Sequence, residues 1–429
     1  MMKIDVSVIM PSLNVGKYIA ESIKSVLAQS LKSIEVICVD AGSTDGTLEI
    51  IQKIASEDIR VKVINSNIKS YGYQVNIGIN EAKGEYVGIV ETDDYISEDM
   101  YEVLYTKAKE FDLDIVKSDY SAYWTQDNGK RMFIKRRMIS DNAFYEKVLC
   151  PSDYYQIGTD DWYLWNGIYK RELIQKNKIR LSESKGAAFQ DIGFIHRTNV
   201  AAERALYLRG DFYRYCIDRE DSSSNLGVGL KYSQAEFSSL LESAKEGTEQ
   251  ILLYQRMCKS FYCSCENITS SKLNENGLRE SFNWLFRAVK ESVDMGIITS
   301  DNMYPSIWKM ICDVISADNI DSYFDNRETT KSSLCKENRY IIFGCGQFGY
   351  EAYKYLRKNE YFVCSFMDNN EAFWGTLINN IPVIRPDEAK YMKKNCFIVA
   401  NEKYCDDITN QLLRYGVEKN RIYNWVELL

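Results

Sequence analysis

Carboxylate side chains cluster directly after an apolar run in the N-terminal part of the chain. The segment Glu91-Thr92-Asp93-Asp94 follows residues 86–90, which are mostly apolar. Alternate side chains of an extended segment point the same way, so we expect Glu91 and Asp93 to face one hard divalent cation, Mn²⁺ or Mg²⁺. Such a cation keeps open positions for phosphate oxygens. A solvated acidic turn is the alternative, because acidic triplets are common by composition.

The single histidine, His196, excludes a His-rich zinc site. Any catalytic metal must therefore be held by carboxylates, which favours magnesium or manganese.

Two more polar loops follow apolar runs. Pro11-Ser12-Leu13-Asn14 comes after residues 4–10, and Asp40-Ala41-Gly42-Ser43-Thr44-Asp45-Gly46 comes after residues 34–39. In an open parallel sheet the ligand crevice lies outside the carboxyl ends of the strands, so we expect these loops to converge with the acidic segment at one edge. Gly42 and Gly46 supply a flexible turn into a helix whose first N–H groups are unsatisfied. Asp40 can accept a hydrogen bond from a base N–H or cap the turn.

The elements that must position these loops alternate between strand and helix patterns. Strands are expected at 4–10, 34–40, 61–65, 86–91 and 113–117, with helices at 16–29, after Gly46, at 73–82 and from Ser97. In the first helix the apolar residues Ile19, Ile23, Val26 and Leu27 recur at helical spacing, and Asn14 lies near the expected N-cap. This alternation predicts an α/β fold with a mostly parallel sheet.

The rest of the chain divides into three further parts. Residues 120–230 mix aromatic strands with short helices and contain a hairpin turn at Asp127-Asn128-Gly129. Residues 231–325 show only helical periodicity, and 326–338 form a polar linker. We therefore expect a first domain over 1–230, a helical segment over 231–325, the linker, and a small Rossmann-like domain over 339–429.

The last domain carries a glycine pattern typical of nucleotide sites. Gly344, Gly346 and Gly349 form a GxGxxG motif between a strand and a helix, with Asp368 about 20 residues further on. The same glycines also allow close packing of a strand on a helix without any ligand. Both interpretations stay open at this point.

The motifs of the first domain resemble those of family 2 GT-A glycosyltransferases, in the same order. The similar segments are Val6-Ser7-Val8-Ile9-Met10-Pro11-Ser12-Leu13-Asn14, Ser25-Val26-Leu27-Ala28-Gln29-Ser30, Val39-Asp40-Ala41-Gly42-Ser43-Thr44-Asp45-Gly46, Asn76-Ile77-Gly78-Ile79, Ala82-Lys83-Gly84-Glu85-Tyr86 and Glu91-Thr92-Asp93-Asp94. The resemblance continues less strongly to about residue 225, through Ile168-Tyr169-Lys170-Arg171-Glu172, Gly186-Ala187-Ala188-Phe189-Gln190-Asp191, Tyr213-Arg214-Tyr215 and Ser222-Ser223-Ser224.

This resemblance implies an inverting, metal-dependent transfer of a sugar from a nucleoside-diphosphate sugar, with UDP the favoured nucleotide. The acceptor would be a hydroxyl of a glycan or lipid-linked molecule in bacterial capsule or other surface polysaccharide synthesis. Asp191 would be the catalytic base, while Glu91 and Asp93 would hold the metal. The implied donor-binding residues are Pro11, Ser12, Asn14, Asp40, Gly42, Ser43, Asn76, Thr92 and Asp93.

A carboxylate at Asp191 suits the chemistry, because an inverting transfer needs a base to take the proton of the attacking hydroxyl. A first-turn or N-cap acid of a helix through Phe194 is the structural alternative.

The chain departs from the family pattern at Ala41, Val75, Glu91 and Gln190. Three of these departures, at Ala41, Val75 and Glu91, motivate a second hypothesis, in which the protein is a non-catalytic nucleotide-sensing or assembly subunit. It would act through the C-terminal domain, which resembles the Rossmann-like domains that precede sugar acetyltransferases. A third and weaker hypothesis, an NAD-dependent enzyme, lacks an accompanying catalytic constellation.

Composition limits the partners. The net charge of −8 argues against general nucleic-acid binding. No apolar run is long enough for a membrane span, and the N-terminus is typical of a strand rather than a signal peptide, so we expect a cytoplasmic protein.

Two further segments have two interpretations each. The basic and apolar run Lys130–Arg137 is typical of a solvated hairpin, or of peripheral contact with the inner face of the membrane. Trp162 and Trp165 suit sugar stacking or an aromatic core.

Overall fold

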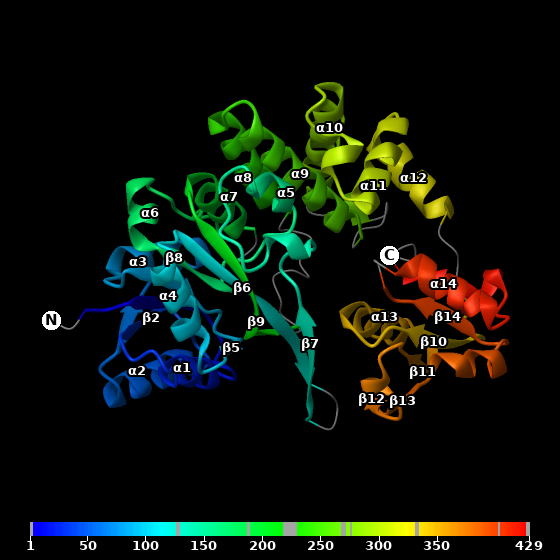
Figure 1. Cartoon of the computed structure of the whole chain (residues 1–429), viewed down its shortest axis with the longest axis horizontal. Coiled ribbons are helices and arrows are strands. Elements are labelled where there is room, and N and C mark those ends of the chain that lie inside the picture. The colour runs from blue at the N-terminus through cyan, green and yellow to red at the C-terminus, as the bar shows by residue number, and fades with distance from the viewer. Residues whose placement is uncertain are drawn as a thin grey trace. The chain divides into compact units, whose positions relative to one another are not determined.

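The computed structural model describes residues 3–125, 129–186, 189–217, 230–266, 272–274, 277–330, 334–401 and 404–425 (Figure 1). The chain forms two compact units. The first contains Met1–Tyr123 and Lys135–Ile320, and the second contains Trp124–Ile134 and Asp321–Leu429.

The sheet of the first unit begins with four parallel strands in the order β3-β2-β1-β4. They are β1 (Val6–Ser12), β2 (Ile34–Asp40), β3 (Val61–Asn65) and β4 (Tyr86–Ile89). Every residue of β1 is buried, as expected for a central parallel strand covered on both faces. The register pairs Ser12 with Asp40. The loops after β1, β2 and β4 therefore open at one edge, which confirms the expected convergence.

The sheet continues through β8 (Gly167–Lys170), β6 (Ile115–Thr125), β9 (Ala205–Cys216) and β5 (Tyr95–Ile96), and β7 (Arg131–Arg136) pairs with β6. Strand β8 is antiparallel to both β4 and β6. In the expected hairpin turn, Asp127 and Asn128 lie outside the described residues, as do Ala187, Ala188 and residues 222–224 of the family-like motifs.

Helices α1 (Ile19–Leu27), α2 (Thr47–Glu57), α3 (Tyr71–Glu81) and α4 (Met100–Glu110) follow the expected positions. The expected N-cap role of Asn14 is wrong, because Tyr18 is the N-cap of α1. Asn14 has a positive φ of 52°, and its side-chain oxygen accepts a hydrogen bond from the Thr44 N–H at 2.9 Å. The residue therefore joins the loops after β1 and β2.

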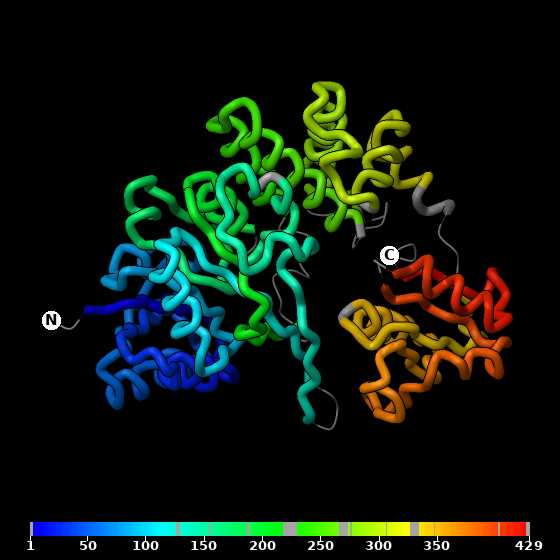
Figure 2. The backbone as a smooth tube through the Cα atoms, viewed as in Figure 1, coloured from blue at the N-terminus to red at the C-terminus, as the bar shows by residue number. Residues whose placement is uncertain are grey.

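Three shorter helices complete this part of the chain: α5 (Tyr154–Ile157), α6 (Arg171–Lys176) and α7 (Asp191–Ala201). The helical region that follows comprises α8 (Leu230–Ser243), α9 (Thr248–Glu266), α10 (Leu278–Asp294), α11 (Pro305–Ser316) and α12 (Ile320–Thr330), which Figure 2 shows in succession. The expected linker over 326–338 is therefore wrong at its start, because α12 continues to Thr330. Buried Tyr323 and Phe324 anchor this helix, whose polar C-terminal turn continues the same hydrogen-bonded backbone. In the described residues no helix is both long and apolar enough to span a bilayer.

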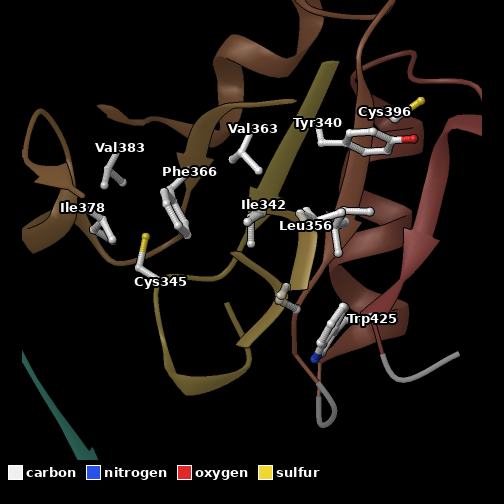
Figure 3. Close-up of a cluster of buried hydrophobic side chains, with 13 residues drawn as sticks. Tyr340, Ile342, Cys345, Leu356, Val363, Phe366, Ile378, Val383, Cys396 and Trp425 are labelled. Carbon is white, nitrogen blue, oxygen red and sulfur yellow. The ribbon is translucent and has the colours of Figure 1, made fainter. Parts of the chain in front are cut away.

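The second unit contains a sheet in the order β12-β13-β11-β10-β14-β15. Its strands are β10 (Arg339–Phe343), β11 (Phe362–Met367), β12 (Leu377–Ile378), β13 (Ile381–Ile384), β14 (Cys396–Val399) and β15 (Ile422–Asn424). All pairings except β12 with β13 are parallel. Helices α13 (Gln347–Lys358) and α14 (Cys405–Arg414) accompany them. Figure 3 shows Leu356, Phe366 and Trp425 in the core on one side of this sheet.

The segment that leads into α7 is tied to the N-terminal half of α3. Asn76 donates to the Leu181 carbonyl oxygen at 2.9 Å and accepts from the Leu181 N–H at 3.0 Å. Gln190 accepts from the Gly72 N–H at 2.6 Å and donates to the Gly186 carbonyl oxygen at 3.2 Å. These buried hydrogen bonds fix the position of the residue that follows Gln190, which is Asp191.

Gly72 allows this close approach, because a Cβ atom added there would lie 1.9 Å from the Ser182 carbonyl oxygen. We expect Gly72→Ala to lower the free energy of unfolding by about 1–3 kcal/mol, although alanine favours helices, because the backbone of the segment must move. Urea denaturation measures this loss. The control Gln52→Ala, on the exposed face of α2, should change stability by less than about 0.5 kcal/mol. An equally stable Gly72→Ala protein would contradict the packing.

Candidate active site

The loop after β2 is organised by the carboxylate of Asp40, which is only 1% exposed. One oxygen accepts the backbone N–H groups of Gly42 and Ser43, both at 2.9 Å, and the other accepts the Ser43 hydroxyl at 2.5 Å. Gly42 has a φ of +79°, with open space where a Cβ atom would be. Asp40 therefore shapes the turn, which agrees with the capping role considered from the sequence, while Gly42 leaves its backbone accessible.

The end of β1 lies beside this turn. Pro11 is buried, and its carbonyl oxygen accepts the Thr92 hydroxyl at 2.9 Å. The buried Ser12 hydroxyl donates to the Val39 carbonyl oxygen at 3.3 Å, and the Ser43 hydroxyl accepts the Asn14 N–H at 2.9 Å. The residues expected after β1, β2 and β4 therefore lie together in one hydrogen-bonded group.

The acidic segment Glu91–Asp94 is a turn and not a strand continuation, because β4 ends at Ile89 and the Asp94 N–H donates to the Glu91 carbonyl oxygen at 3.1 Å. The expectation that strand alternation orients Glu91 and Asp93 is therefore wrong. Both residues are nevertheless partly exposed, while Thr92 and Asp94 are buried. The turn, and not a strand, therefore leaves Glu91 and Asp93 partly exposed and buries Thr92 and Asp94.

Asp94 holds the turn in place. Its carboxylate accepts the Tyr213 hydroxyl at 2.9 Å and the Cys216 N–H at 2.7 Å, and the Tyr213 hydroxyl in turn accepts the Glu91 N–H at 3.0 Å. Burial, and then the neighbouring charge of Asp93, raises the pKa of Asp94 well above its usual range. The strand β9 thus supports the acidic turn, a contact that no pattern in the sequence predicted.

Tyr71, the first residue of α3, contacts the acidic turn and lies within electrostatic range of Asp191. Its hydroxyl donates to a Glu91 carboxylate oxygen at 2.5 Å. Burial raises the pKa of Tyr71 well above its usual range, and the charges of Glu91 and Asp191 raise it further. The sequence reasoning missed this residue, because nothing in the spacing around it distinguishes a tyrosine at a helix start.

Asp191 is the first residue of α7, so the helix-terminal placement considered from the sequence is correct. The residue is partly exposed, yet burial of its carboxyl group raises the pKa of Asp191 to about 6. Glu236 raises this pKa further, whereas the N–H groups of Asp191 and Ile192, together with Lys117, lower it. A carboxylate with this raised pKa is a stronger proton acceptor than an ordinary aspartate.

A buried ion pair lies beneath this region. The Lys117 ammonium group contacts the Asp161 carboxylate at 2.6 Å, and both side chains are fully buried. Asp161 also accepts hydrogen bonds from Asn199 at 3.0 Å and Tyr207 at 2.7 Å, and Arg256 donates to its carbonyl oxygen at 2.9 Å. Against the effect of burial, Lys117 and Arg256 lower the pKa of Asp161. In the sequence, the one indication of this buried ion pair was Lys117, which directly follows the apolar residues Ile115 and Val116.

Two further expectations concern Asn76 and the tryptophans. The Asn76 amide is 3% exposed and hydrogen-bonded to the segment before Asp191, so it positions that segment.

Trp165 is 5% exposed and stacks on Tyr213 with ring centroids 4.2 Å apart. It belongs to an aromatic core. The ring centroid of Trp162 lies 5.7 Å from the Arg256 guanidinium carbon and 5.5 Å from the Lys259 ammonium nitrogen.

The acidic turn suits a hard divalent cation that needs few protein ligands. Within the described residues no group of three or more metal-ligating side chains gathers at one point. Two carboxylates, from Glu91 and Asp93, remain at the exposed side of the turn. Magnesium and manganese fit such a pair, because these ions use few protein carboxylates and complete their shell with water and phosphate oxygens.

The glycines of the GxGxxG motif in the second unit make close packing contacts. A Cβ atom on Gly349 would lie 1.9 Å from the Gly344 carbonyl oxygen, and one on Gly344 would lie 2.6 Å from the Ala400 carbonyl oxygen. The Asp368 carboxylate accepts the N–H groups of Cys345 at 2.7 Å and Asn370 at 2.8 Å. Asp368 therefore closes its own loop, and the close contacts of Gly344 and Gly349 agree with the packing interpretation, while a nucleotide site at Gly344, Gly346, Gly349 and Asp368 stays a prediction. Gly346 lies between Gly344 and Gly349 as the N-cap of α13.

Comparison with known proteins agrees with this arrangement. The sequence model described as glycosyl transferase family 2 matches residues 7–177, and one described as C2185-like, N-terminal, matches residues 336–423. The glycosyltransferase GlyG of Streptococcus pneumoniae is 31% identical over 219 residues, which are 49% of this chain and 70% of GlyG. The cholesterol galactosyltransferase of Borreliella burgdorferi is 31% identical over 269 residues, covering 61% and 74% of the two chains.

Among solved structures, residues 1–349 of TarS from S. aureus in complex with UDP-GlcNAc align with a TM-score of 0.57 at 19% identity. The alignment covers 78% of this chain and 94% of that one, whereas the chain spans 56% of a longer TarS chain. The structural likeness shows the shared fold. Together with the family match and the relatives at 31% identity, it leads to one conclusion: the chain belongs to glycosyl transferase family 2 and has a GT-A domain.

Proposed function

We propose that this glycosyltransferase is an inverting, metal-dependent enzyme that moves a sugar from a nucleoside-diphosphate sugar to a hydroxyl of a glycan or lipid-linked acceptor in bacterial surface polysaccharide synthesis. One observation carries the proposal. Asp191, with a pKa raised to about 6, shares Tyr71 as a neighbour with Glu91 of the acidic turn. The proposed proton acceptor and the proposed cation-binding turn thus act on the same tyrosine, which supports a common site.

The donor would lie across the loops after β1 and β2. Gly42 is exposed with open space around its Cα, which leaves room for a nucleotide diphosphate, and the positive N-terminal end of the α2 dipole suits its charge. The structurally similar TarS fragment was solved in complex with UDP-GlcNAc, which supports UDP as the nucleotide in our proposal. Pro11, Ser12 and Asp40 would shape this pocket through the hydrogen bonds described above.

The cation would bind Glu91 and Asp93. When bound, a divalent cation neutralises charge on the departing diphosphate. Thr92, tied to the Pro11 carbonyl oxygen, and Asp94, tied to Tyr213 and Cys216, would keep the two carboxylates at the surface of the turn. The hydroxyl of Tyr71 would orient Glu91.

Asp191 would act as the base. As the acceptor hydroxyl attacks the anomeric carbon from the face opposite the diphosphate, its proton passes to the Asp191 carboxylate, and the configuration at that carbon inverts. The hydrogen bonds of Gln190 and Asn76 hold the segment that leads to this residue, so the carboxylate is positioned before the substrate binds.

Our proposal places residues 1–230 in the catalytic domain, a helical segment from 231 to the end of α12 at Thr330, and residues 339–429 in a separate Rossmann-like domain. It includes a cytoplasmic location, because all twelve cysteines are free thiols, which suits a reducing compartment. Contact with the inner face of the membrane through Lys130–Arg137 would bring the enzyme to a lipid-linked acceptor.

Replacing the proposed base tests the mechanism. We expect Asp191→Asn to lower kcat by about 10²–10⁴-fold, because the amide cannot take the hydroxyl proton, while donor binding is retained. Release of UDP from UDP-sugars measures kcat, and thermal stabilisation by UDP measures binding. Glu203→Gln, an exposed acid beyond α7, is the matched control and should keep full activity. An Asn variant within tenfold of the wild-type kcat would exclude Asp191 as the base.

The cation site has a separate test. We expect UDP with Mn²⁺ to stabilise the wild-type protein by about 2.7 kcal/mol at 100 times the dissociation constant, and UDP alone to stabilise it much less. In Asp93→Ala the additional effect of Mn²⁺ should disappear, because a carboxylate ligand is lost. Glu98→Gln, an exposed acid near the turn, should behave as wild type. Equal Mn²⁺ dependence in Asp93→Ala and wild type would contradict the assignment.

A further inference from the structure

The second compact unit includes a segment from the middle of the chain, Trp124–Ile134, besides Asp321–Leu429. We call this segment the arm. It contains the end of β6 and the start of β7, and its residues 126–128 lie outside the described part of the chain. Trp124 and Ile134 both lie against the start of α13. The arm is therefore packed where the sequence predicts a nucleotide site.

Trp124 contacts α13 through a stacked pair of rings. Its side chain is 1% exposed, and its ring lies 4.8 Å from the ring of Tyr350, centroid to centroid, with 23° between the ring planes. Tyr350 belongs to the start of α13 and is itself buried. Stacked aromatic rings bury a large apolar area and favour one relative orientation, so this pair holds the arm against the helix.

Ile134 lies against the second glycine of the GxGxxG motif. A Cβ atom added to Gly346 would lie 2.8 Å from the Ile134 Cδ1 atom. Apart from the chain neighbours of Gly346, no other atom of the described residues comes within 4 Å of that point. Gly344 and Gly349 instead approach backbone atoms of their own sheet and loop. The first and third glycines thus serve the local fold, whereas Gly346 leaves room for the arm.

Burial along β7 alternates as expected for a strand with one covered face. Met132 and Ile134 are partly buried, whereas Phe133 is 45% exposed and the Lys135 side chain is 81% exposed. Met132 also lines a cavity together with Phe373, a residue of the second unit. The face that carries Met132 and Ile134 is therefore turned toward the rest of this unit.

This position of Ile134 bears on nucleotide binding. In a dinucleotide-binding fold the second glycine lets the diphosphate approach the backbone, at the start of a helix whose N–H groups attract it. Here the apolar end of Ile134 occupies the space beside Gly346. The Cys345 N–H, directly before Gly346, already donates to the Asp368 carboxylate at 2.7 Å. A diphosphate at this point would have to displace the side chain of Ile134.

We propose that the glycine motif of the second unit is a docking site for the arm, and that the docked arm and a nucleotide diphosphate at Gly346 exclude one another. The partner of this surface is an apolar segment of the same chain. The inference goes beyond the proposed transfer reaction and does not depend on it, because none of these residues belongs to the proposed donor, cation or base sites.

Hydrogen–deuterium exchange of the full chain, measured by mass spectrometry, tests the contact from both sides. In Ile134→Ala we expect the amides of residues 343–350 to exchange at least about threefold faster than in the wild type, because their cover opens more often. In Tyr350→Leu, which removes the stacked ring, residues 129–136 should exchange faster. Phe133→Ala, on the exposed face of β7, is the matched control and should leave residues 343–350 unchanged.

Unchanged exchange of residues 343–350 in a folded Ile134→Ala protein would overturn the docking, as would an equal rise in Phe133→Ala. If thermal denaturation shows that Ile134→Ala is unstable, Ile134→Val, which removes only the Cδ1 atom, should give a smaller rise in the same residues. Tyr350→Phe keeps the ring and should leave residues 129–136 as in the wild type.

Exclusion is tested on the wild-type protein with NAD and, separately, UDP as probes. We expect either no change in residues 343–350, because the arm stays docked, or slower exchange there together with faster exchange in residues 129–136, because the nucleotide displaces the arm. Slower exchange in residues 343–350 without faster exchange in residues 129–136 would show that both fit at once and would overturn the exclusion.

Discussion

Strand β1 is hydrogen-bonded in parallel to β2 on one side and to β4 on the other, so the carboxyl ends of three neighbouring strands open at one edge of the sheet. Once this register forms, the polar loops that follow β1, β2 and β4 all begin at this edge of the sheet. Asp40, Thr92 and Asn14 then form hydrogen bonds within or between the loops, which hold the loops of this edge together. The donor site proposed for this enzyme depends on that parallel pairing.

Asp191, the base in our proposal, is positioned by a different set of interactions. Asn76 and Gln190 use buried amides to hold the segment before α7 against α3, and Gly72 gives the backbone room to approach. Beneath it, the fully buried pair of Lys117 and Asp161 is stable only because further hydrogen bonds offset the cost of removing both charges from water.

The helical region adds charge to this site. Arg256 from α9 reaches the Asp161 carbonyl oxygen, and Glu236 from α8 reaches the first turn of α7. The helical segment therefore packs on the catalytic domain through polar contacts as well as apolar ones. In the second unit, by contrast, Gly344 and Gly349 serve the packing of β10, α13 and β14, because they contact backbone atoms of their own sheet and loop.

Periodicity and loop composition alone predicted the strands of the parallel sheet, the four helices beside them and the grouping of Ser12, Asp40 and Asp93, because these features follow from local patterns and from the geometry of parallel strands. The direction of Glu91 and the roles of Asn14, Asn76 and Asp368 depended on hydrogen bonds between distant segments, for which neither spacing nor residue type carries a signal. The same holds for Tyr71 and Lys117. Their importance comes from burial and from charges brought together in three dimensions, and only tertiary packing decides which acids share a low-dielectric site.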